Sequence, residues 1–331
     1  MLMDYDHKRL LVKAARLYYE QDMTQAEIST QLRLSRQKVQ RILDEAREEG
    51  IVNISIHPIM GIFYELEKAL EKRFELSESL VVETSGPDNQ DTIAREVGAG
   101  AAEYLTRLIR PKDKIVISSG NSLLGMVNAL GSRTRVPVRG MVLIQGLGGL
   151  LGDPDSGIYG AELVQRAAKA LAAQPVLFPA PAIASSAAVR DALYADPYVS
   201  KTLELARSAD LAFVGIGSSD VNTIAAPEMW RFLPPNALPD LFARGAVGSI
   251  NLRYFDKAGC LVPSELNERI IGLTLEDLKR INRVVGIAGG SAKLQAIHAA
   301  LQGHLIDVLV TDHLTAKALM EIPIEPSKTT R

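Results

Sequence analysis

The chain has 331 residues, of which 47% are hydrophobic and 23% charged, and its formal net charge is −2. This composition is typical of a globular protein long enough for two domains and a large buried core. The single cysteine, Cys260, excludes an internal disulfide framework and a thiol-rich metal site. No apolar run reaches membrane-spanning length, and the first residues lack the apolar stretch of a signal peptide. We therefore expect a cytoplasmic protein without a membrane partner.

The first 56 residues have the pattern of a helical domain. Residues 7–19 carry a stripe of apolar side chains at helical spacing. Thr24 and Glu27 have the spacing of a capping box, and Ser35 is a second N-cap residue, so we expect one helix to begin at each of these two caps. Apolar and polar residues then alternate over residues 51–56, which predicts a short half-buried strand.

The two capped helices have the apolar spacing of a helix-turn-helix unit, which needs two helices packed at a steep angle. Val39 and Ile42 lie on one face of the second helix and are expected to be buried. The opposite face presents arginine and glutamine, which suit bidentate contacts with guanine and adenine, while lysine and serine suit phosphates. The predicted DNA-binding residues are Thr24, Gln25, Ser35, Arg36, Gln37, Lys38, Gln40 and Arg41.

The distribution of charge supports this assignment. Residues 1–56 contain nine Lys or Arg and nine Asp or Glu, but residues 33–41 contain four basic residues and no acid. Two positions depart from the usual pattern: Arg33 stands where the turn commonly has glycine, and Ser29 stands where alanine is common. Arg33 must adopt an unfavourable backbone conformation, or the turn differs slightly. The alternative is a solvated basic helix on an ordinary helical subdomain.

After the helix predicted over residues 63–74, which we interpret as a connector, short apolar runs alternate with helical stretches. This alternation predicts a mostly parallel α/β domain. Residues 247–262 have the pattern of a hairpin with its turn at residues 256–259, so a small antiparallel part is also expected. The predicted strands are residues 80–83, 114–118, 141–145, 175–178, 211–215, 284–288 and 308–311. The predicted parts of the chain are a DNA-binding domain (1–56), a connector (57–78) and an effector-binding and oligomerisation domain (79–331).

Several motifs give the chain a family resemblance. They are TQAEISTQLRLSRQKVQRIL (24–43), REEGIV (47–52), GAVG (245–248), YFD (254–256), GIAGG (286–290), Lys293 and VTD (310–312). With these motifs the chain resembles the SorC/DeoR-type sugar-responsive bacterial regulators over nearly its whole length. The resemblance implies a winged helix-turn-helix joined to a sugar-phosphate-binding domain similar to glucosamine-phosphate deaminase, ribose-phosphate isomerase and CoA transferases. It also implies a dimer or tetramer whose operator binding changes when a phosphorylated sugar or related metabolite binds.

The residues themselves offer an effector site. Ligands of open parallel sheets bind beyond the carboxyl ends of the strands, and hydroxyls with free N–H groups at a helix start suit a phosphate. Lys293 falls in a first helical turn, where an anion must compensate its charge, and Asp256 can accept hydrogen bonds from sugar hydroxyls. The predicted ligand-binding residues are Ser119, Gly120, Asn121, Ser122, Gly146, Gly148, Gly149, Asp256, Gly290 and Lys293. Alternatively, the glycines only shape turns, Asp256 belongs to a hairpin turn, and Lys293 is a surface residue.

These observations predict a transcriptional regulator of a carbohydrate-utilisation operon. Its predicted partners are double-stranded operator DNA, a phosphorylated sugar or polyol, and further copies of the chain. We expect no cofactor and no metal, since the five histidines lack ligand spacing. One alternative is a sugar-phosphate isomerase, deaminase or lyase with an added helical domain, although no cluster of residues demands catalysis. Another is a metabolite-binding scaffold whose basic helix contacts a protein.

Overall fold

The computed structural model describes residues 2–53, 61–86, 89–133, 139–149, 160–218 and 237–323. The chain divides into two compact units, residues 1–60 and 61–331, and each has its own hydrophobic core. No helix within these described ranges is long and apolar enough to cross a bilayer. The same ranges contain no group of three His, Cys, Asp or Glu side chains arranged to hold a metal ion.

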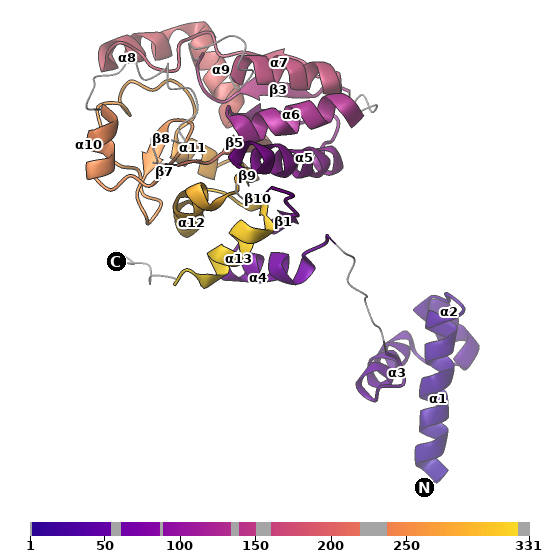
Figure 1. Ribbon diagram of the computed structural model, residues 1–331. Coiled ribbons are helices and arrows are strands. Elements are labelled where there is room, and N and C mark those ends of the chain that lie inside the picture. Colours follow the sequence, from indigo (N-terminus) through magenta and orange to yellow (C-terminus); the bar gives the residue numbers. More distant parts are fainter. Residues whose placement is uncertain are drawn as a thin grey trace, which may run out of the picture. The chain divides into compact units, whose positions relative to one another are not determined.

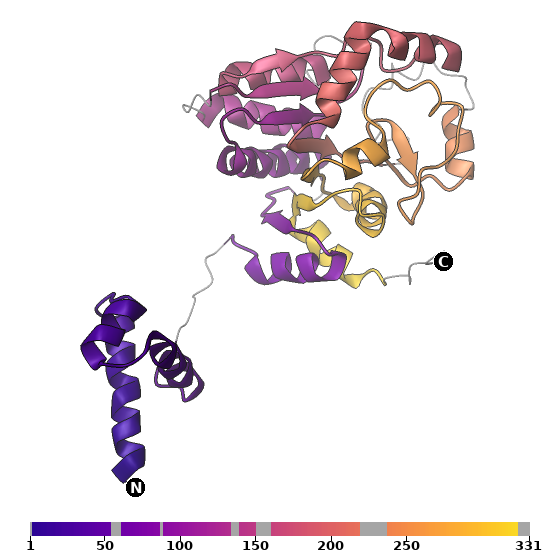
Figure 2. The ribbon, with the colours of Figure 1, turned by 180° about the vertical axis from the view of Figure 1, so that it is seen from behind.

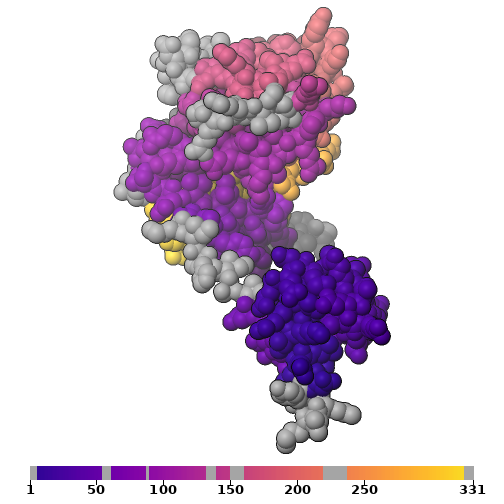
Figure 3. Space-filling model, turned by 90° about the vertical axis from the view of Figure 1, so that its right-hand side faces the viewer, coloured from indigo at the N-terminus to yellow at the C-terminus, as the bar shows by residue number. Residues whose placement is uncertain are grey.

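The first unit consists of helices α1 (Leu2–Tyr19), α2 (Gln25–Leu32) and α3 (Arg36–Glu48) (Figure 1). Figure 3 shows this unit, in indigo, as a compact body. Both predicted N-caps are confirmed. The Thr24 hydroxyl accepts the Glu27 N–H while the Glu27 carboxylate accepts the Thr24 N–H, and the Ser35 hydroxyl accepts the Lys38 N–H. The core of the unit consists of Leu11, Ala14, Ala15, Leu17, Ile28, Val39, Ile42, Leu43 and Ala46.

The end of this unit differs from the prediction of a strand over residues 51–56. Residues 51–53 form a bend that pairs with no strand, and residues 54–56 lie outside the described part of the chain. The backbone N–H of Val52 instead donates to the carbonyl of Ala46, so the chain folds back on the end of α3. Ile51 and Val52 pack against the core of the unit, which accounts for their apolar character without a strand.

The turn between α2 and α3 contains the strained residue that the sequence predicts. Arg33 has φ 55° and ψ 44°, the left-handed conformation that costs a residue with a Cβ about 1–2 kcal/mol. Ser29 stabilises this turn, because its hydroxyl donates to the Leu34 carbonyl at 2.6 Å and its carbonyl accepts the Leu34 N–H at 3.0 Å. Alanine cannot donate that side-chain hydrogen bond, which explains why serine rather than alanine suits position 29.

The second unit contains a seven-stranded parallel sheet in the order β1-β10-β9-β5-β2-β3-β4. All seven strands were predicted, and their ends differ from the prediction by at most two residues at each terminus. They are β1 (Glu78–Val82), β2 (Lys114–Ile117), β3 (Val142–Gln145), β4 (Gln174–Val176), β5 (Leu211–Gly215), β9 (Val284–Ile287) and β10 (Val308–Asp312).

Helices cover both faces of this sheet, as Figures 1 and 2 show from opposite sides. One face packs against α5 (Gln90–Leu108), α6 (Asn121–Arg133) and α7 (Gly160–Leu171). The cluster on the other face draws residues from α4 (Tyr64–Phe74), α9 (Pro197–Arg207), α11 (Leu275–Lys279), α12 (Leu294–Gln302) and α13 (His313–Glu321). Between α9 and β4 lies α8 (Ala187–Ala195), and α10 (Ala237–Ala243) precedes the small sheet. The second unit is thus a three-layer α/β domain, with the sheet between two layers of helices.

The strand order reverses between β2 and β5. The chain runs from β2 outward through β3 to β4, then returns to β5 beside β2 and continues outward in the other direction through β9 to β10. The connections that leave β2 and β5 therefore diverge, and ligands of open α/β sheets bind at such a reversal, beyond the carboxyl ends of the strands. We call residues 118–122 after β2 and residues 215–218 after β5 the switch-point loops.

The small antiparallel sheet is present, and the predicted turn at residues 256–259 is closed by an antiparallel bridge between Phe255 and Leu261. The prediction missed a second hairpin just before it. Strands β6 (Gly217–Ser218), β7 (Gly248–Ile250) and β8 (Arg253–Phe255) form it, so residues 247–255 are themselves a hairpin rather than one strand. Its two-residue turn is Asn251-Leu252, with φ 51° and 61°. The sequence signal was weak because leucine seldom occupies a left-handed turn position.

Helix α4, which the sequence analysis interprets as a connector, covers the edge of the sheet. Its Glu71 and Glu67 carboxylates accept the outward N–H groups of Ser79 and Val81 on edge strand β1, each at 2.9 Å. An uncovered edge strand is a template for pairing with another chain, and these carboxylates satisfy its free donors. Burial raises the pKa of Glu67. Helix α4 therefore packs as an integral part of the second unit.

The strained turn gives a first prediction. Arg33→Gly removes the penalty of the left-handed conformation and is expected to raise the free energy of unfolding of the first unit by about 1 kcal/mol. Chemical denaturation followed by circular dichroism of the isolated residues 1–60 and of the full chain measures this change. Arg36→Gly is the matched control, because glycine inside a helix is destabilising by about 1 kcal/mol. Equal destabilisation by both substitutions would contradict the assigned conformation of Arg33.

Candidate functional sites

Helix α3 has one buried and one exposed face. Val39, Ile42, Leu43 and Ala46 are buried in the core of the first unit, as predicted. Ser35, Arg36, Gln37, Lys38, Gln40 and Arg41 are all exposed. The side chains of Arg36, Gln37, Lys38 and Arg41 make no hydrogen bond or ion pair with any described residue, so three cations and one amide are available to a partner.

The remaining predicted DNA-binding residues have partners within the first unit. Thr24 uses its hydroxyl to cap α2, and half-buried Gln25 donates from Nε2 to Oε1 of Gln40 at 2.8 Å. Gln40 in turn donates to Asp44 at 3.3 Å. This chain of amides joins α2 to α3 and orients the exposed Gln40 side chain. The carboxylate of Asp44 also pairs with Arg47.

In the second unit, the start of α6 is the best-formed anion site among the predicted loops. First-turn N–H groups have no acceptor within their own helix, and the described residues supply none for Asn121, Ser122 and Leu123. Ser122 is 3% exposed, and its Oγ has no hydrogen-bond partner among the described residues. Buried polar groups are rarely left unsatisfied, so this hydroxyl with the aligned N–H groups suits a phosphate.

The loop after β5 closes on the same site. A Cβ added at Gly215 would lie 3.2 Å from the carbonyl oxygen of Ser119, so the two switch-point loops approach each other closely. The short 3₁₀ helix η3 (Ser291–Lys293) packs against β6, which directly follows β5. Residues 219–236 of the post-β5 loop lie outside the described part of the chain.

Lys293 stands at the N-cap of α12 and is half-buried. Its ammonium has no hydrogen bond or ion pair within the described part of the chain. Burial lowers the pKa of Lys293 to about 8. A half-buried cation at the positive end of a helix is unfavourable without an anion, so Lys293 and the start of α6 both favour a negatively charged ligand.

The glycines at 146, 148 and 149 do not present free N–H groups. Gly146, Gly148 and Gly149 donate to the carbonyls of Ile117, Ile271 and Ala180. A Cβ at Gly148 would lie 2.4 Å from the carbonyl oxygen of Pro181, so this glycine allows two protein segments to pack closely. The structure therefore favours the purely structural interpretation for these three positions.

Gly290 is also used internally. Its N–H donates to Asp312 Oδ2 at 2.9 Å and to Thr315 Oγ1 at 2.8 Å, and its φ of 93° favours glycine. Asp312 is 1% exposed and caps α13 by accepting the N–H groups of Leu314 and Thr315. Gln90 donates to the carbonyl of Gly289 at 2.9 Å. Gly290 thus fixes the loop that carries Lys293, and its own N–H is not available to a ligand.

Asp256 is hydrogen-bonded within its own turn. Its carboxylate accepts the N–H groups of Ala258 and Cys260, at 2.9 and 3.0 Å, within its own turn. That turn packs through Gly259 against Gly303, beyond the C-terminal end of α12, whereas Lys293 precedes the opposite end. Nine residues of helix separate the two ends, which is roughly 14 Å. These hydrogen bonds favour the alternative in which Asp256 is a turn residue, and α12 separates its turn from Lys293.

Asn251 was not among the predicted site residues. It lies in the turn between β7 and β8, is 6% exposed, and accepts the Ser118 hydroxyl on Oδ1 at 2.5 Å, while its Nδ2 has no partner among the described residues. The signal in the sequence was an asparagine at a two-residue turn position, but that residue type is expected there for backbone reasons alone. Its contact with the end of β2 could not be inferred from the sequence.

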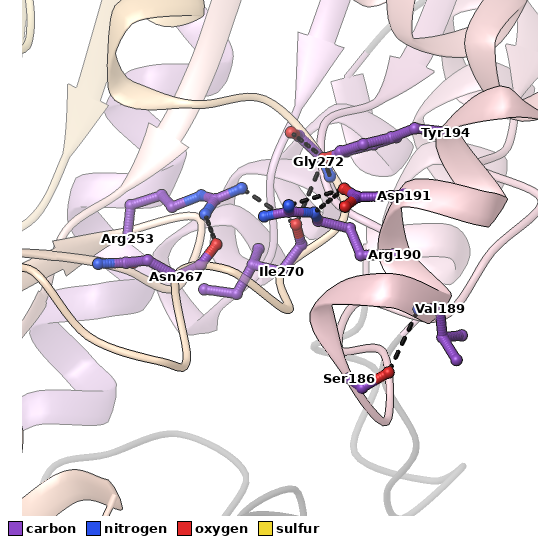
Figure 4. A network of polar contacts seen from close by, with 9 residues as sticks. All are labelled: Ser186, Val189, Arg190, Asp191, Tyr194, Arg253, Asn267, Ile270 and Gly272. Atoms are coloured by element: carbon purple, nitrogen blue, oxygen red, sulfur yellow. Dashed lines mark hydrogen bonds and ion pairs between the residues drawn. The ribbon is translucent and has the colours of Figure 1, made fainter.

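A buried arginine fixes the hairpin that carries Asn251 (Figure 4). Arg253, 5% exposed, donates to the carbonyls of Asn267 and Ile270 at 2.5 and 3.1 Å, and burial lowers its pKa. The Tyr194 hydroxyl on α8 contacts the carbonyls of Ile270 and Gly272. Gly272 forms a bridge with Leu147, so this network joins β8 to the segment that follows β3.

Comparisons with known proteins identify the family of the chain. Residues 61–321 match the family model described as "Putative sugar-binding domain". The chain is 30% identical to the deoxyribonucleoside regulator of Bacillus subtilis over 96% of this chain and 99% of that protein. It is 32% identical to the transcriptional regulator LsrR of Escherichia coli K12 over 94% of each chain.

A solved structure covers both units. The crystal structure of the full-length sorbitol operon regulator SorC from Klebsiella pneumoniae is similar with a TM-score of 0.72 and 32% identity, over 96% of this chain and 100% of that chain. These relatives are transcriptional regulators, which decides against the enzymatic alternative. The chain therefore belongs to the SorC/DeoR family of sugar-binding transcriptional regulators.

Proposed function

We propose that the chain binds operator DNA through α3 and changes its affinity for that DNA when a phosphorylated sugar or polyol binds at the switch-point loops. One observation carries this proposal: two sites in one chain, α3 and the start of α6, present polar groups whose partners are missing from the described residues. Each set has the chemistry of its expected partner. The specific operon and metabolite are set by contacts at these two sites.

For DNA, the proposal rests on the exposed face of α3. Arg36, Gln37, Gln40 and Arg41 extend from successive turns of the helix, so they can reach base edges in a major groove while Ser35 and Lys38 contact phosphates. A homodimer would place two such helices in successive major grooves, spaced by the helical repeat of DNA. The chain's net charge of −2 means that attraction to DNA depends on this local basic segment.

For the effector, the proposal rests on the start of α6 and on Lys293. The N–H groups of Asn121 to Leu123 and the Ser122 hydroxyl would hold the phosphate, with Ser119 and Gly120 forming the loop around it. Lys293 would neutralise its charge. Asp256, Gly146, Gly148, Gly149 and Gly290 are left out of this set, because their polar groups bind other protein atoms.

A continuous series of contacts leads from the effector site to α4. Gly290, three residues before Lys293, donates to Asp312, which caps α13. His313, the first residue of α13, stacks its ring on Phe63 with ring centroids 5.2 Å apart and planes inclined by 13°. Phe63 is the N-cap residue of α4. A displacement of the 289–293 loop by a ligand would therefore reach α4 through α13, and coupling of about 1–3 kcal/mol would suffice for regulation.

The DNA-binding proposal predicts that Arg36→Ala and Arg41→Ala each weaken operator binding by about 5- to 150-fold, which is about 1–3 kcal/mol for a lost bidentate contact. Fluorescence anisotropy with a duplex selected from a random library by the wild-type protein measures this loss. Lys13→Ala removes an exposed charge from α1 and is the matched control, with an expected change below twofold. Unchanged affinity in both α3 variants, with folding intact, would mean that another surface contacts DNA.

The effector proposal predicts a pH dependence. Lys293 has a pKa of about 8 without ligand, and a bound phosphate favours its protonated form and raises that pKa. Affinity for a sugar phosphate is therefore highest below pH 8 and falls by up to about tenfold per pH unit above it. Isothermal titration between pH 7 and pH 9.5, using the tightest binder from a thermal-shift panel of phosphorylated sugars and polyols, tests this. Lys293→Met is expected to abolish the dependence. An identical pH profile in that variant would remove Lys293 from the site.

The route through α13 predicts that Phe63→Ala reduces coupling without damaging either site. Coupling is the ratio of operator affinities with and without saturating effector, and we expect it to fall by about fivefold, or roughly 1 kcal/mol. Effector affinity measured without DNA should change by less than twofold. Tyr64→Ala is the matched control, because Tyr64 is the next residue and is 56% exposed. Equal coupling in Phe63→Ala and wild type would exclude this route.

A further inference from the structure

Asn251 is buried in a place where hairpin turns are usually solvated. Asn251 and Leu252 both have left-handed backbone conformations, and asparagine is favoured in such turns because it tolerates positive φ. This preference explains the residue type but not its burial: Asn251 is only 6% exposed, and its side chain reaches the loop that follows β2. The turn therefore delivers a polar side chain to the carboxyl-terminal edge of the main sheet.

In the Asn251 carboxamide, the oxygen Oδ1 has a hydrogen-bond partner, whereas the nitrogen Nδ2 has none among the described residues. Its Oδ1 accepts the Ser118 hydroxyl at 2.5 Å, which fixes the plane of the amide and leaves Nδ2 as the free donor. Nδ2 is buried and has no acceptor among the described residues. Leaving a buried donor unpaired is costly, so such a group points to a missing acceptor. Ser122 Oγ, four residues along the same loop from Ser118, is another buried polar atom without a partner among the described residues.

The surroundings of Nδ2 place that missing acceptor beside the proposed phosphate site. A Cβ at Gly146 would lie 3.6 Å from Nδ2 and 2.8 Å from Val116 Cγ1, so glycine at 146 keeps side-chain atoms away from the amide. Gly146 directly follows β3, and Ser118 directly follows β2. The amide thus lies over the ends of two adjacent strands, next to the loop whose helix would hold the phosphate.

The hairpin is held firmly enough to position a donor. Arg253, two residues after Asn251, is anchored by two carbonyls of the 267–270 segment, as Figure 4 shows. Ile250 and Phe255 of the same hairpin are buried in the main core. A donor held by a packed hairpin is preorganised, which is what discrimination between similar ligands requires.

We propose that Asn251 Nδ2 donates a hydrogen bond to a hydroxyl or carbonyl oxygen on the carbon chain of the bound sugar phosphate, and so helps to determine which sugar phosphate binds. The inference rests on the proposed function, because it assumes that the phosphate binds at the start of α6. Its chemistry is specific: a neutral amide donor selects an oxygen acceptor, whereas the phosphate group is held by N–H groups and Lys293. A ligand without that oxygen leaves the donor unpaired and binds more weakly.

Two variants test the proposal while keeping the turn. Asn251→Gly removes the amide, and Asn251→Asp keeps the shape and the acceptor but removes the donor; both residues tolerate positive φ. Leu252→Gly is the matched control, because it alters the same turn without changing a polar side chain. The ligands are inorganic phosphate, the tightest sugar phosphate from the thermal-shift panel, and deoxy analogues of that compound that each lack one oxygen. Isothermal titration with the full-length protein gives each dissociation constant.

We expect Asn251→Gly to weaken binding of the sugar phosphate by about 3- to 10-fold, the usual effect of losing one hydrogen bond, and to leave binding of inorganic phosphate unchanged. One deoxy analogue should bind wild type more weakly by a similar factor but bind wild type and Asn251→Gly equally. Asn251→Asp should weaken the sugar phosphate further, because it adds a negative charge near the phosphate. Leu252→Gly should match wild type.

The outcomes separate this inference from the proposed function. Suppose that the wild type binds sugar phosphates and that Ser122→Ala weakens this binding. If Asn251→Gly then discriminates among all the deoxy analogues as the wild type does, the inference is wrong and the proposed function stands. If wild type binds neither inorganic phosphate nor any sugar phosphate, both are wrong.

Discussion

The reversal of strand order between β2 and β5 is the constraint on which the rest of this structure depends. Because the chain leaves these neighbouring strands in opposite directions, the start of α6 lies at a reversal of strand order, where ligands of open α/β sheets bind. The first-turn N–H groups of α6 and the Ser122 hydroxyl then have no protein acceptor among the described residues. The same topology brings β6 and η3, with Lys293, to the adjacent position.

The polar groups at the carboxyl edge of the main sheet are of two kinds: those that bind other protein atoms and those without a partner among the described residues. The first kind donates hydrogen bonds to other protein atoms, and these bonds fix the loops. It consists of the N–H groups of Gly146, Gly148, Gly149 and Gly290. Ser122, Asn251 and Lys293 each keep a polar group that no described residue satisfies. Burying such groups costs free energy, so their retention is best explained by a ligand that satisfies them.

Contacts through α4 connect the edge strand β1 with α13 and the loop before Lys293. Glu67 and Glu71 cap the free N–H groups of β1, which holds α4 against the sheet. Phe63, at the beginning of α4, stacks on His313 of α13, whose capping residue Asp312 holds the loop before Lys293. Helix α4 is thus in contact with both the edge of the sheet and α13.

Local patterns in the sequence were enough to predict much of the fold. The capping box at Thr24, the buried face of α3, the strained Arg33 and all seven parallel strands follow from residue spacing and short-range chemistry, and the structure confirms them. The site was harder to predict because it depends on contacts between distant segments. Gly148 has the same local sequence signal whether it approaches a ligand or Pro181, and Asp256 has the same signal as a ligand or a turn residue. Asn251 reaches Ser118 across 133 positions, which no local pattern predicts.

Amide hydrogen exchange at the start of α6 tests the central claim most directly, because it observes the proposed phosphate donors themselves. With a saturating sugar phosphate, the N–H groups of Asn121, Ser122 and Leu123 should become protected, while those of Gly146, Gly148 and Gly149, already bonded to protein carbonyls, should change little. Protection of the 146–149 segment, with no change at residues 121–123, would contradict the account.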